Sequence, residues 1–352
     1  MKTVWKFGLK GSRSVSHRRP LLHADRAILT INHGQDSNFN GTLVCLDFDS
    51  GEELWRFDHE HFFAQPVISS DGFVYVTSFS GHVLKFDMRG HLCWQAQPSE
   101  QNLWGGILSH DRFVYAEIAG QSKYSRAIDC QSGEVIWTFE NGGHCYGLAA
   151  RETAGCIIHS VSVSPKFGEW NYILYCTDAV TGALVWQQEY KHILFDPVIL
   201  GDHVFVGSRN HVAIFDLNNG RFLDRYDLKA QGDVSQKPII VDEKVIVASQ
   251  HGHVAALVVE ESRKGLLRRR NPDVTASWEL DLSANIRSSV MGSEDTVLIL
   301  TEDGMCHSLA GHDGTIDRTV KIPYFKDGYG LSQTPDGLLV AASRDCLRVK
   351  IN

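Results

Sequence analysis

The residues best suited to chemistry are histidines, cysteines and acidic side chains, and their spacing forms no recurrent catalytic pattern. The chain has 17 histidines and 42 acidic residues among 352 positions. Two histidine pairs are close in sequence, namely His59 with His61 and His251 with His253. Neither pair has a carboxylate at a recurrent metal-ligand spacing, and no Ser/His/Asp triad can be assembled from spacing alone. The sequence therefore predicts no catalytic residue and no metal site.

The eight cysteines indicate core thiols rather than a metal or redox centre. No two are adjacent and no Cys-x-x-Cys spacing occurs, so zinc or thioredoxin-type chemistry has no sequence support. Cys45, Cys176 and Cys306 lie in apolar, strand-like runs. Free, reduced thiols packed in a core fit this placement and a reducing compartment.

A recurring segment must position whatever site the chain has. The stretch at 45–57, CLDFDSGEELWRF, returns in degraded form at 85–96, 127–139, 176–187 and 214–226. Each unit contains three apolar or β-branched runs separated by short turns with Asp, Gly or Asn. A D-x-x-x-G turn then leads to a fourth run that carries Trp. Four short strands in succession are typical of a β-meander.

The repeat predicts an all-β fold, an eight-bladed β-propeller of four-stranded antiparallel blades. Eight units in 352 residues give 44 residues each, the usual length of a propeller blade. The last unit has only three strands, and TVWKFGL at 3–9 resembles the fourth strand of the others. We expect this N-terminal strand to complete the last blade and close the ring, which removes exposed sheet edges. The predicted single domain, 1–352, has its closing strand at 3–9 and its blades at 20–57, 64–96, 105–139, 146–187, 197–226, 237–280, 288–320 and 330–352.

The end of each unit resembles the repeat of the pyrroloquinoline-quinone-like (tryptophan-docking) β-propellers. The full motif, D-x-x-T-G-x-x-x-W, is matched by Asp178, Thr181, Gly182 and Trp186, and partial matches extend over essentially the whole chain. Two units depart from it, with Asp224 and Arg318 at the Trp position. In this motif Asp bonds to its own turn, Gly supplies a positive φ, and Trp reaches the neighbouring blade. These residues are therefore interpreted as structural.

The resemblance implies one of two kinds of protein. Quinoprotein dehydrogenases hold quinone and calcium at the centre of the ring, whereas other members bind no cofactor and act as scaffolds. The quinoproteins are usually periplasmic, but this sequence begins MKTVWKFGLKGSRS, without the apolar stretch of a secretory signal. No apolar run reaches the length of a membrane helix, so no membrane partner is expected. The chain resembles a cytoplasmic, cofactor-free member, and its net charge of −8 argues against nucleic acid as a partner.

Unequal loops suggest where a partner binds. Most loops between the second and third strands are short, but those at 32–41, 116–125 and 160–171 are long. Six of the eight tryptophans take docking positions and two do not. Because long loops on a rigid scaffold often carry function, we predict a protein-binding patch there, with neutral drift in loop length as the alternative. Its predicted residues are Trp104, Trp170, Phe39, Tyr124, Phe167 and Tyr146.

Two further regions have alternative interpretations. The connections from each fourth strand to the next unit are rich in aromatics, and we expect Phe63, Phe195 and Tyr329 at the rim of a central funnel. There they would bind a small carbohydrate or peptide, together with Tyr146, or plug the channel as packing. The basic insertion at 260–273 is either a solvated loop or a contact for nucleic acid or an acidic protein.

These observations predict a non-catalytic scaffold whose partner is another protein. A cytoplasmic inhibitor or immunity-type protein, capping a toxin or enzyme with its long-loop face, fits an acidic, rigid propeller. A quinone-dependent oxidoreductase and a small-ligand binder are the alternatives. The sequence does not name the partner.

Overall fold

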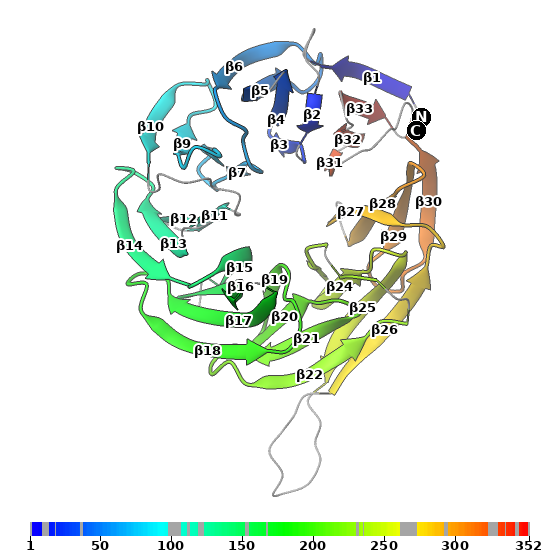
Figure 1. The fold of residues 1–352 in the computed structure, drawn as a ribbon. Coiled ribbons are helices and arrows are strands. Elements are labelled where there is room, and N and C mark those ends of the chain that lie inside the picture. The colour runs from blue at the N-terminus through cyan, green and yellow to red at the C-terminus, as the bar shows by residue number, and fades with distance from the viewer. Residues whose placement is uncertain are drawn as a thin grey trace, which may run out of the picture. The chain divides into compact units, whose positions relative to one another are not determined.

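The computed structural model confirms an all-β chain (Figure 1). It describes residues 2–8, 14–17, 19–35, 38–97, 107–110, 113–118, 123–151, 155–166, 168–229, 232–234, 236–260, 273–291, 295–322, 330–334, 336–341 and 345–350. Within these ranges no helix is long and apolar enough to span a membrane. By internal contacts the chain divides into two compact units. The first comprises Met1–Cys145, Ala179–Gly182 and Ile322–Asn352, and the second comprises Tyr146–Asp178 and Ala183–Lys321.

The first unit contains four antiparallel sheets, β31-β32-β33-β1, β2/β3-β4-β5-β6, β7-β8-β9-β10 and β11-β12-β13-β14. Its strands are β1 (Lys2–Phe7), β2 (Ser14–His17), β3 (Leu21–His23), β4 (Arg26–Gln35), β5 (Asn38–Asp47), β6 (Glu53–His59), β7 (Val67–Ile68), β8 (Val74–Thr77), β9 (Val83–Phe86), β10 (Leu92–Ala96), β11 (Ile107–His110), β12 (Phe113–Ile118), β13 (Tyr124–Asp129), β14 (Val135–Glu140), β31 (Gly330–Thr334), β32 (Gly337–Ala341) and β33 (Cys346–Lys350).

The second unit contains four more sheets, each a meander in chain order from β15 to β30. Its strands are β15 (His144–Arg151, whose first two residues belong to the first unit), β16 (Cys156–Lys166), β17 (Glu169–Asp178), β18 (Leu184–Tyr190), β19 (Pro197–Leu200), β20 (His203–Gly207), β21 (His211–Asp216), β22 (Phe222–Asp227), β23 (Ile239–Val241), β24 (Lys244–Ala248), β25 (His253–Glu260), β26 (Asp273–Asp281), β27 (Ile286–Met291), β28 (Thr296–Thr301), β29 (Met305–Ala310) and β30 (Ile316–Lys321). The described residues thus form the eight predicted blades.

The N-terminal strand completes the last blade, as predicted. β1 pairs antiparallel with β33, from Lys2 opposite Lys350 to Phe7 opposite Cys346. The first blade differs from the prediction because it holds five strands. The short strands β2 and β3 both pair with β4, one along each half of it, so they share the inner edge of that sheet.

The core lies between the sheets. The middle strands are buried on both faces, and every residue of β8 and β9 is buried. The outermost strands alternate, with β14 and β18 exposing most of their residues around one buried Trp. This pattern explains why the second and third runs of each unit are almost wholly apolar or small.

Six of the blades are joined to the turn of the next blade by a docking tryptophan. Each indole Nε1–H donates to a backbone carbonyl at 2.8–3.1 Å, in the pairs Trp5–Phe48, Trp55–Met88, Trp94–Cys130, Trp137–Ala179, Trp186–Leu217 and Trp278–Gly311. The ring covers the turn glycine, and a Cβ added at Gly182 would lie 2.6 Å from Trp137 Cδ2. Gly182 also has φ +72°, which favours glycine.

A missing Trp coincides with a missing turn. β22 carries Asp224 at the docking position, opposite Ile214. In the following blade, the basic insertion replaces the D-x-x-x-G turn that this strand would contact. The Trp and the turn of the next blade are thus retained or lost together, as expected if they form one packing unit.

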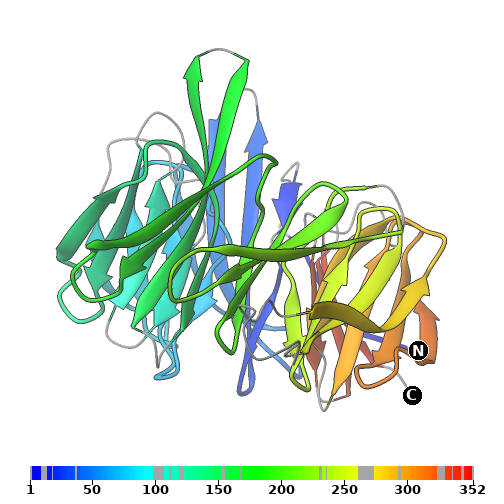
Figure 2. The same cartoon turned by 90° about the horizontal axis from the view of Figure 1, so that it is seen from below.

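The three predicted long loops are mostly paired strands. The ladder of β4 and β5 continues to Gln35 opposite Asn38, and that of β12 and β13 continues to Ile118 opposite Tyr124. In the second unit, β16 and β17 pair as far as Lys166 opposite Glu169. These segments satisfy their backbone hydrogen bonds within a hairpin, so they extend as strands rather than as irregular loops. Figure 2 shows the β16–β17 hairpin, in green, reaching beyond the rest of its own sheet.

Candidate functional site

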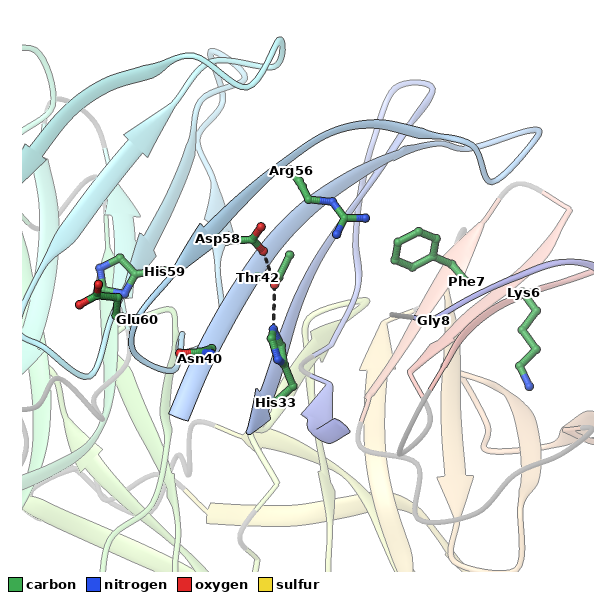
Figure 3. Close-up of a pocket in the computed structure, with 10 residues that line it drawn as sticks. All are labelled: Lys6, Phe7, Gly8, His33, Asn40, Thr42, Arg56, Asp58, His59 and Glu60. Carbon is green, nitrogen blue, oxygen red and sulfur yellow. Dashed lines mark hydrogen bonds between the residues drawn. The ribbon is translucent and has the colours of Figure 1, made fainter. Parts of the chain in front are cut away.

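A polar cavity of about 770 Å³ opens in the first unit, between the end of β1 and the outer strands of the first blade (Figure 3). Figure 3 shows Arg56 of β6 and Phe7 of β1 on opposite sides of the opening, while Lys6 points away and pairs with Asp345 at 2.8 Å. Its lining residues are Lys6, Phe7, Gly8, His33, Asn40, Thr42, Arg56, Asp58, His59 and Glu60.

A chain of hydrogen bonds crosses three strands at one wall of this cavity. The Thr42 hydroxyl donates to Asp58 Oδ1 at 2.7 Å, and His33 Nε2 lies 3.0 Å from Thr42 Oγ1. Because the hydroxyl proton is directed to Asp58, His33 Nε2–H must be the donor to Thr42. Burial lowers the pKa of His33, and the Asp58 carboxylate opposes that effect.

This arrangement favours binding over nucleophilic catalysis. In a hydrolytic triad the hydroxyl donates to histidine and histidine donates to the carboxylate. Here the Thr42 hydroxyl donates to Asp58 directly, so His33 does not act as its base. The Thr42 side chain is also fully buried. The wall offers fixed acceptors. Asn40 offers donors to a polar group in the cavity, as does Nη1 of Arg56, whose Nε and Nη2 pair with Glu53.

Histidines at the far end of β6 are packed together. The ring of His59 lies 5.8 Å from those of His61 and His82, and the His61 backbone N–H donates to His59 Nδ1 at 3.1 Å. Desolvation by burial is the main effect lowering the pKa of His59 and of His82. Among the described residues, no group of three or more His, Cys, Asp or Glu side chains is arranged to hold a metal ion.

The β16–β17 hairpin carries an exposed aromatic side chain of the predicted patch. Trp170 is 53% exposed, although it lies within a strand. β18 pairs with β17 only from Tyr172 onward, so the hairpin beyond that residue is two-stranded. Its ladder continues through Val163 opposite Asn171. A large indole is thus presented on backbone that is hydrogen-bonded on one side.

The other predicted patch residues have varied environments. Tyr124 begins β13, is half-buried, and lies under the guanidinium of Arg126, whose Cζ is 5.6 Å from the ring centroid. Phe39 belongs to β5, opposite Gly34. Trp104 and Phe167 lie outside the described residues.

Of the predicted funnel residues, the structure brings two together. The rings of Tyr146 and Phe195 meet edge to face at 6.0 Å in the second unit, and Tyr146 is 36% exposed. Phe63 has no exposed ring, because its side chain is fully buried and its backbone is held by both amide atoms of Asn32. Phe63 therefore belongs to the packed core. Tyr329 lies outside the described residues.

Sequence reasoning missed the polar cavity. Its wall combines His33, Thr42 and Asp58, which stand on three successive strands and share no motif. The register aligns Thr42 directly with Asp58 on β6. On the other side Thr42 pairs with Ile31, and His33, two residues further along β4, is on the same face of the sheet. A signal was present only in the alternation of side chains along the strands, which places alternate residues on one face of a sheet.

Eight antiparallel sheets, fastened by Trp on the turn of the next blade, define the class of this protein as an eight-bladed β-propeller. A family model described as "Outer membrane protein assembly factor BamB" matches residues 2–223 and 126–266. The chain belongs to this family, as the predicted pyrroloquinoline-quinone-like repeat implied.

Individual relatives are distant. BamB of Nitrosomonas eutropha is 26% identical over 152 residues, covering 42% of this chain and 35% of the relative. BamB of Shewanella oneidensis is 21% identical over 242 residues, covering 63% of this chain and 58% of the relative. The chain thus spans less than two thirds of each of these curated relatives. The crystal structure of BamB from Moraxella catarrhalis has a TM-score of 0.65 at 15% identity, covering 99% of both chains, and shares the fold.

Proposed function

We propose that this propeller is a non-catalytic protein-interaction scaffold whose β16–β17 hairpin binds the partner through Trp170. The observation that carries the proposal is the 53% exposure of Trp170 on a hydrogen-bonded hairpin. Tryptophan is prominent among residues that dominate binding energy at interfaces. Its side chain has few rotatable bonds, and a paired strand limits backbone freedom, so little entropy is lost on binding.

The family supports this class of function. Relatives are described as outer membrane protein assembly factors, and a factor that assembles other proteins must bind proteins. We transfer the protein-binding class alone to this chain. Trp104, Phe167, Phe39 and Tyr124 stay predicted contributors to the binding surface, each to be tested separately.

Affinity capture with matched variants tests the proposal. We expect the wild-type chain to capture a specific partner from native lysate, and Trp170→Ala to lose that partner while its thermal unfolding is unchanged. Val185→Ala is the control, because Val185 is 56% exposed on the edge strand β18, away from the hairpin tip. The same captured proteins with all three chains would refute the role of Trp170.

We also propose the finer role predicted from the sequence, a cytoplasmic inhibitor or immunity-type protein. An acidic, rigid propeller with an extended hairpin suits a protein that caps a toxin or enzyme. Co-expression with the products of neighbouring genes tests it, and rescue of growth from a toxic product is the expected result. Cell fractionation tests the location, and recovery of the chain in the envelope fraction would overturn the cytoplasmic assignment.

A further inference from the structure

A cluster of basic side chains lies at the base of the β16–β17 hairpin, within the second unit. It comprises Lys191, His192, Arg209, His211 and Arg225, here called the basic cluster. These residues come from the segment after β18, the β20–β21 turn, the start of β21 and β22. The rings of His192 and His211 are 5.3 Å apart and meet edge to face. Such a concentration of cations is unexpected in a chain with a net charge of −8.

The basic cluster and Trp170 are on the same side of the hairpin. Side chains two residues apart share one face of a strand, so Trp170 and Tyr172 point the same way, about 7 Å apart along β17. Tyr172 pairs directly with Tyr190 of β18, so their side chains share that face. The Tyr190 hydroxyl is 2.9 Å from His211 Nε2, which joins this face to the basic cluster.

The packing of the same face confirms its direction. Tyr172 and Tyr190 pack against the apolar cluster that includes Val204, Val206 and Phe215 of the next sheet. Trp170 lies beyond the last of these contacts, where β18 no longer accompanies β17. Trp170 thus lies on the hairpin beyond the packed tyrosines, and the basic cluster lies beside Tyr190.

Most of the positive charge in the basic cluster is uncompensated. Arg225 pairs with Asp227 at 3.2 Å, whereas no acidic side chain among the described residues forms an ion pair with Lys191 or Arg209. Burial first, then the charges of Lys191, Arg209 and Arg225, lowers the pKa of His192. Burial also lowers the pKa of His211 to about 4. Both imidazoles are therefore neutral at pH 7, and the three long cationic side chains carry the charge.

We propose that this surface binds an acidic segment of a partner protein, with an apolar side chain against Trp170 and carboxylates on Lys191, Arg209 and Arg225. This inference rests on the proposed scaffold function and adds the chemistry of the partner. Guanidinium and ammonium groups recognise carboxylates by charge-assisted hydrogen bonds. Nucleic acid is the weaker candidate, because three cations on an acidic protein neutralise few phosphates.

Selection from a phage-displayed library of random peptides tests the inference without the native partner. The full chain is the target, and we expect the enriched peptides to be net negative and to contain an aromatic or large aliphatic residue. The best peptide is then synthesised with a fluorophore and titrated by anisotropy. We expect its binding to weaken as the salt concentration rises, since exposed charges are screened.

Charge reversal with a matched control locates the binding surface. Lys191→Glu/Arg209→Glu should weaken peptide binding by at least about tenfold, since it replaces attraction by repulsion. Arg318→Glu/Lys321→Glu makes the same change of charge on exposed positions of β30, in the same unit, and should leave binding within about twofold. Circular dichroism and thermal unfolding verify that both variants fold.

Several results would overturn the inference. These are enriched peptides that are neutral or basic, no enriched peptide at all, or equal affinity for both double variants. Binding of oligodeoxythymidine or inorganic phosphate in competition with the peptide would show a general anion site instead. Loss of the native partner on Trp170→Ala together with any of these results would leave the scaffold function standing and refute only the acidic-partner assignment.

Discussion

The substitution Gly220→Ala measures how much the docking of Trp186 contributes to the stability of the fold. It lies in the turn before β22 with φ +72°, and Trp186 covers it. A Cβ added there would lie 2.7 Å from Trp186 Cδ2, closer than real carbon contacts allow. Gly220→Ala must therefore either displace the indole or shift the turn. A displaced indole also weakens the 2.8 Å hydrogen bond from its Nε1 to the Leu217 carbonyl.

Gly201 is the matched control for this substitution. It belongs to the same unit and has φ +57°, but a Cβ added there has nothing within 4 Å. Both alanine variants carry the cost of a left-handed conformation, about 1–2 kcal/mol. Gly220→Ala adds overpacking against the ring, about 1–3 kcal/mol. We expect a total of about 2–5 kcal/mol for Gly220→Ala and about 1–2 kcal/mol for Gly201→Ala.

Urea unfolding measures the difference, with far-ultraviolet circular dichroism and tryptophan fluorescence as independent probes. Coincident transitions from the two probes would justify a single free energy of unfolding, and the change in midpoint then gives the loss of stability. If the probes disagree, the order of the thermal midpoints still ranks the variants. Equal destabilisation by Gly201→Ala and Gly220→Ala would refute the reasoning, because it would leave only the backbone cost.

Three further predictions follow from individual contacts. Trp186→Phe should cost about 1–3 kcal/mol in unfolding free energy, because the buried Leu217 carbonyl loses its donor, whereas Trp170→Phe at an exposed site should change stability little. Burial lowers the pKa of His159 to about 3, below the ordinary value of 6.5 that it regains on unfolding. The unfolded chain therefore binds a proton that the folded chain excludes, stability falls as pH drops from 6.5 toward 3, and His159→Leu should reduce that slope by up to about 1.4 kcal/mol per pH unit in urea titrations. Thr42→Val should destabilise the chain by about 1–3 kcal/mol, since it deletes a buried hydroxyl with two hydrogen-bond partners, and Thr42→Ser should restore most of the loss in the same assay.

The sequence predicted the fold because the signal repeats. Asp178, Gly182 and Trp186 form a local pattern whose physical requirement, a tight turn followed by a docked indole, is the same in every complete unit. The closing strand was predictable for the same reason, since Trp5 carries the signature of a fourth strand at the wrong end of the chain. The prediction was wrong where the local sequence does not distinguish a loop from a paired strand. The long β4–β5 and β16–β17 ladders were expected to be loops.

The candidate sites were less predictable. Trp170 was assigned to the predicted patch by exclusion, because it did not fit the docking pattern, and its side chain is exposed. Phe63 was expected at the rim of a funnel, but its side chain is fully buried. The basic cluster and the His33–Thr42–Asp58 chain were not predicted from the sequence. The members of each group come from different strands and turns and share no sequence motif, and strand pairing and sheet packing bring them together.

The sequence by itself determined the all-β class, the number of blades, the docking tryptophans and the strand that completes the last blade. These depend on local chemistry, namely turn residues, strand alternation and a repeated indole. Only the tertiary structure decided how buried side chains are neutralised. Arg348 is buried in β33, where it contacts the Phe48 carbonyl and pairs with Asp336 and Asp49. No pattern in the sequence marks such contacts, because Phe48 and Asp49 lie about 300 residues from Arg348 in the chain and meet it only when the first and last blades pack together.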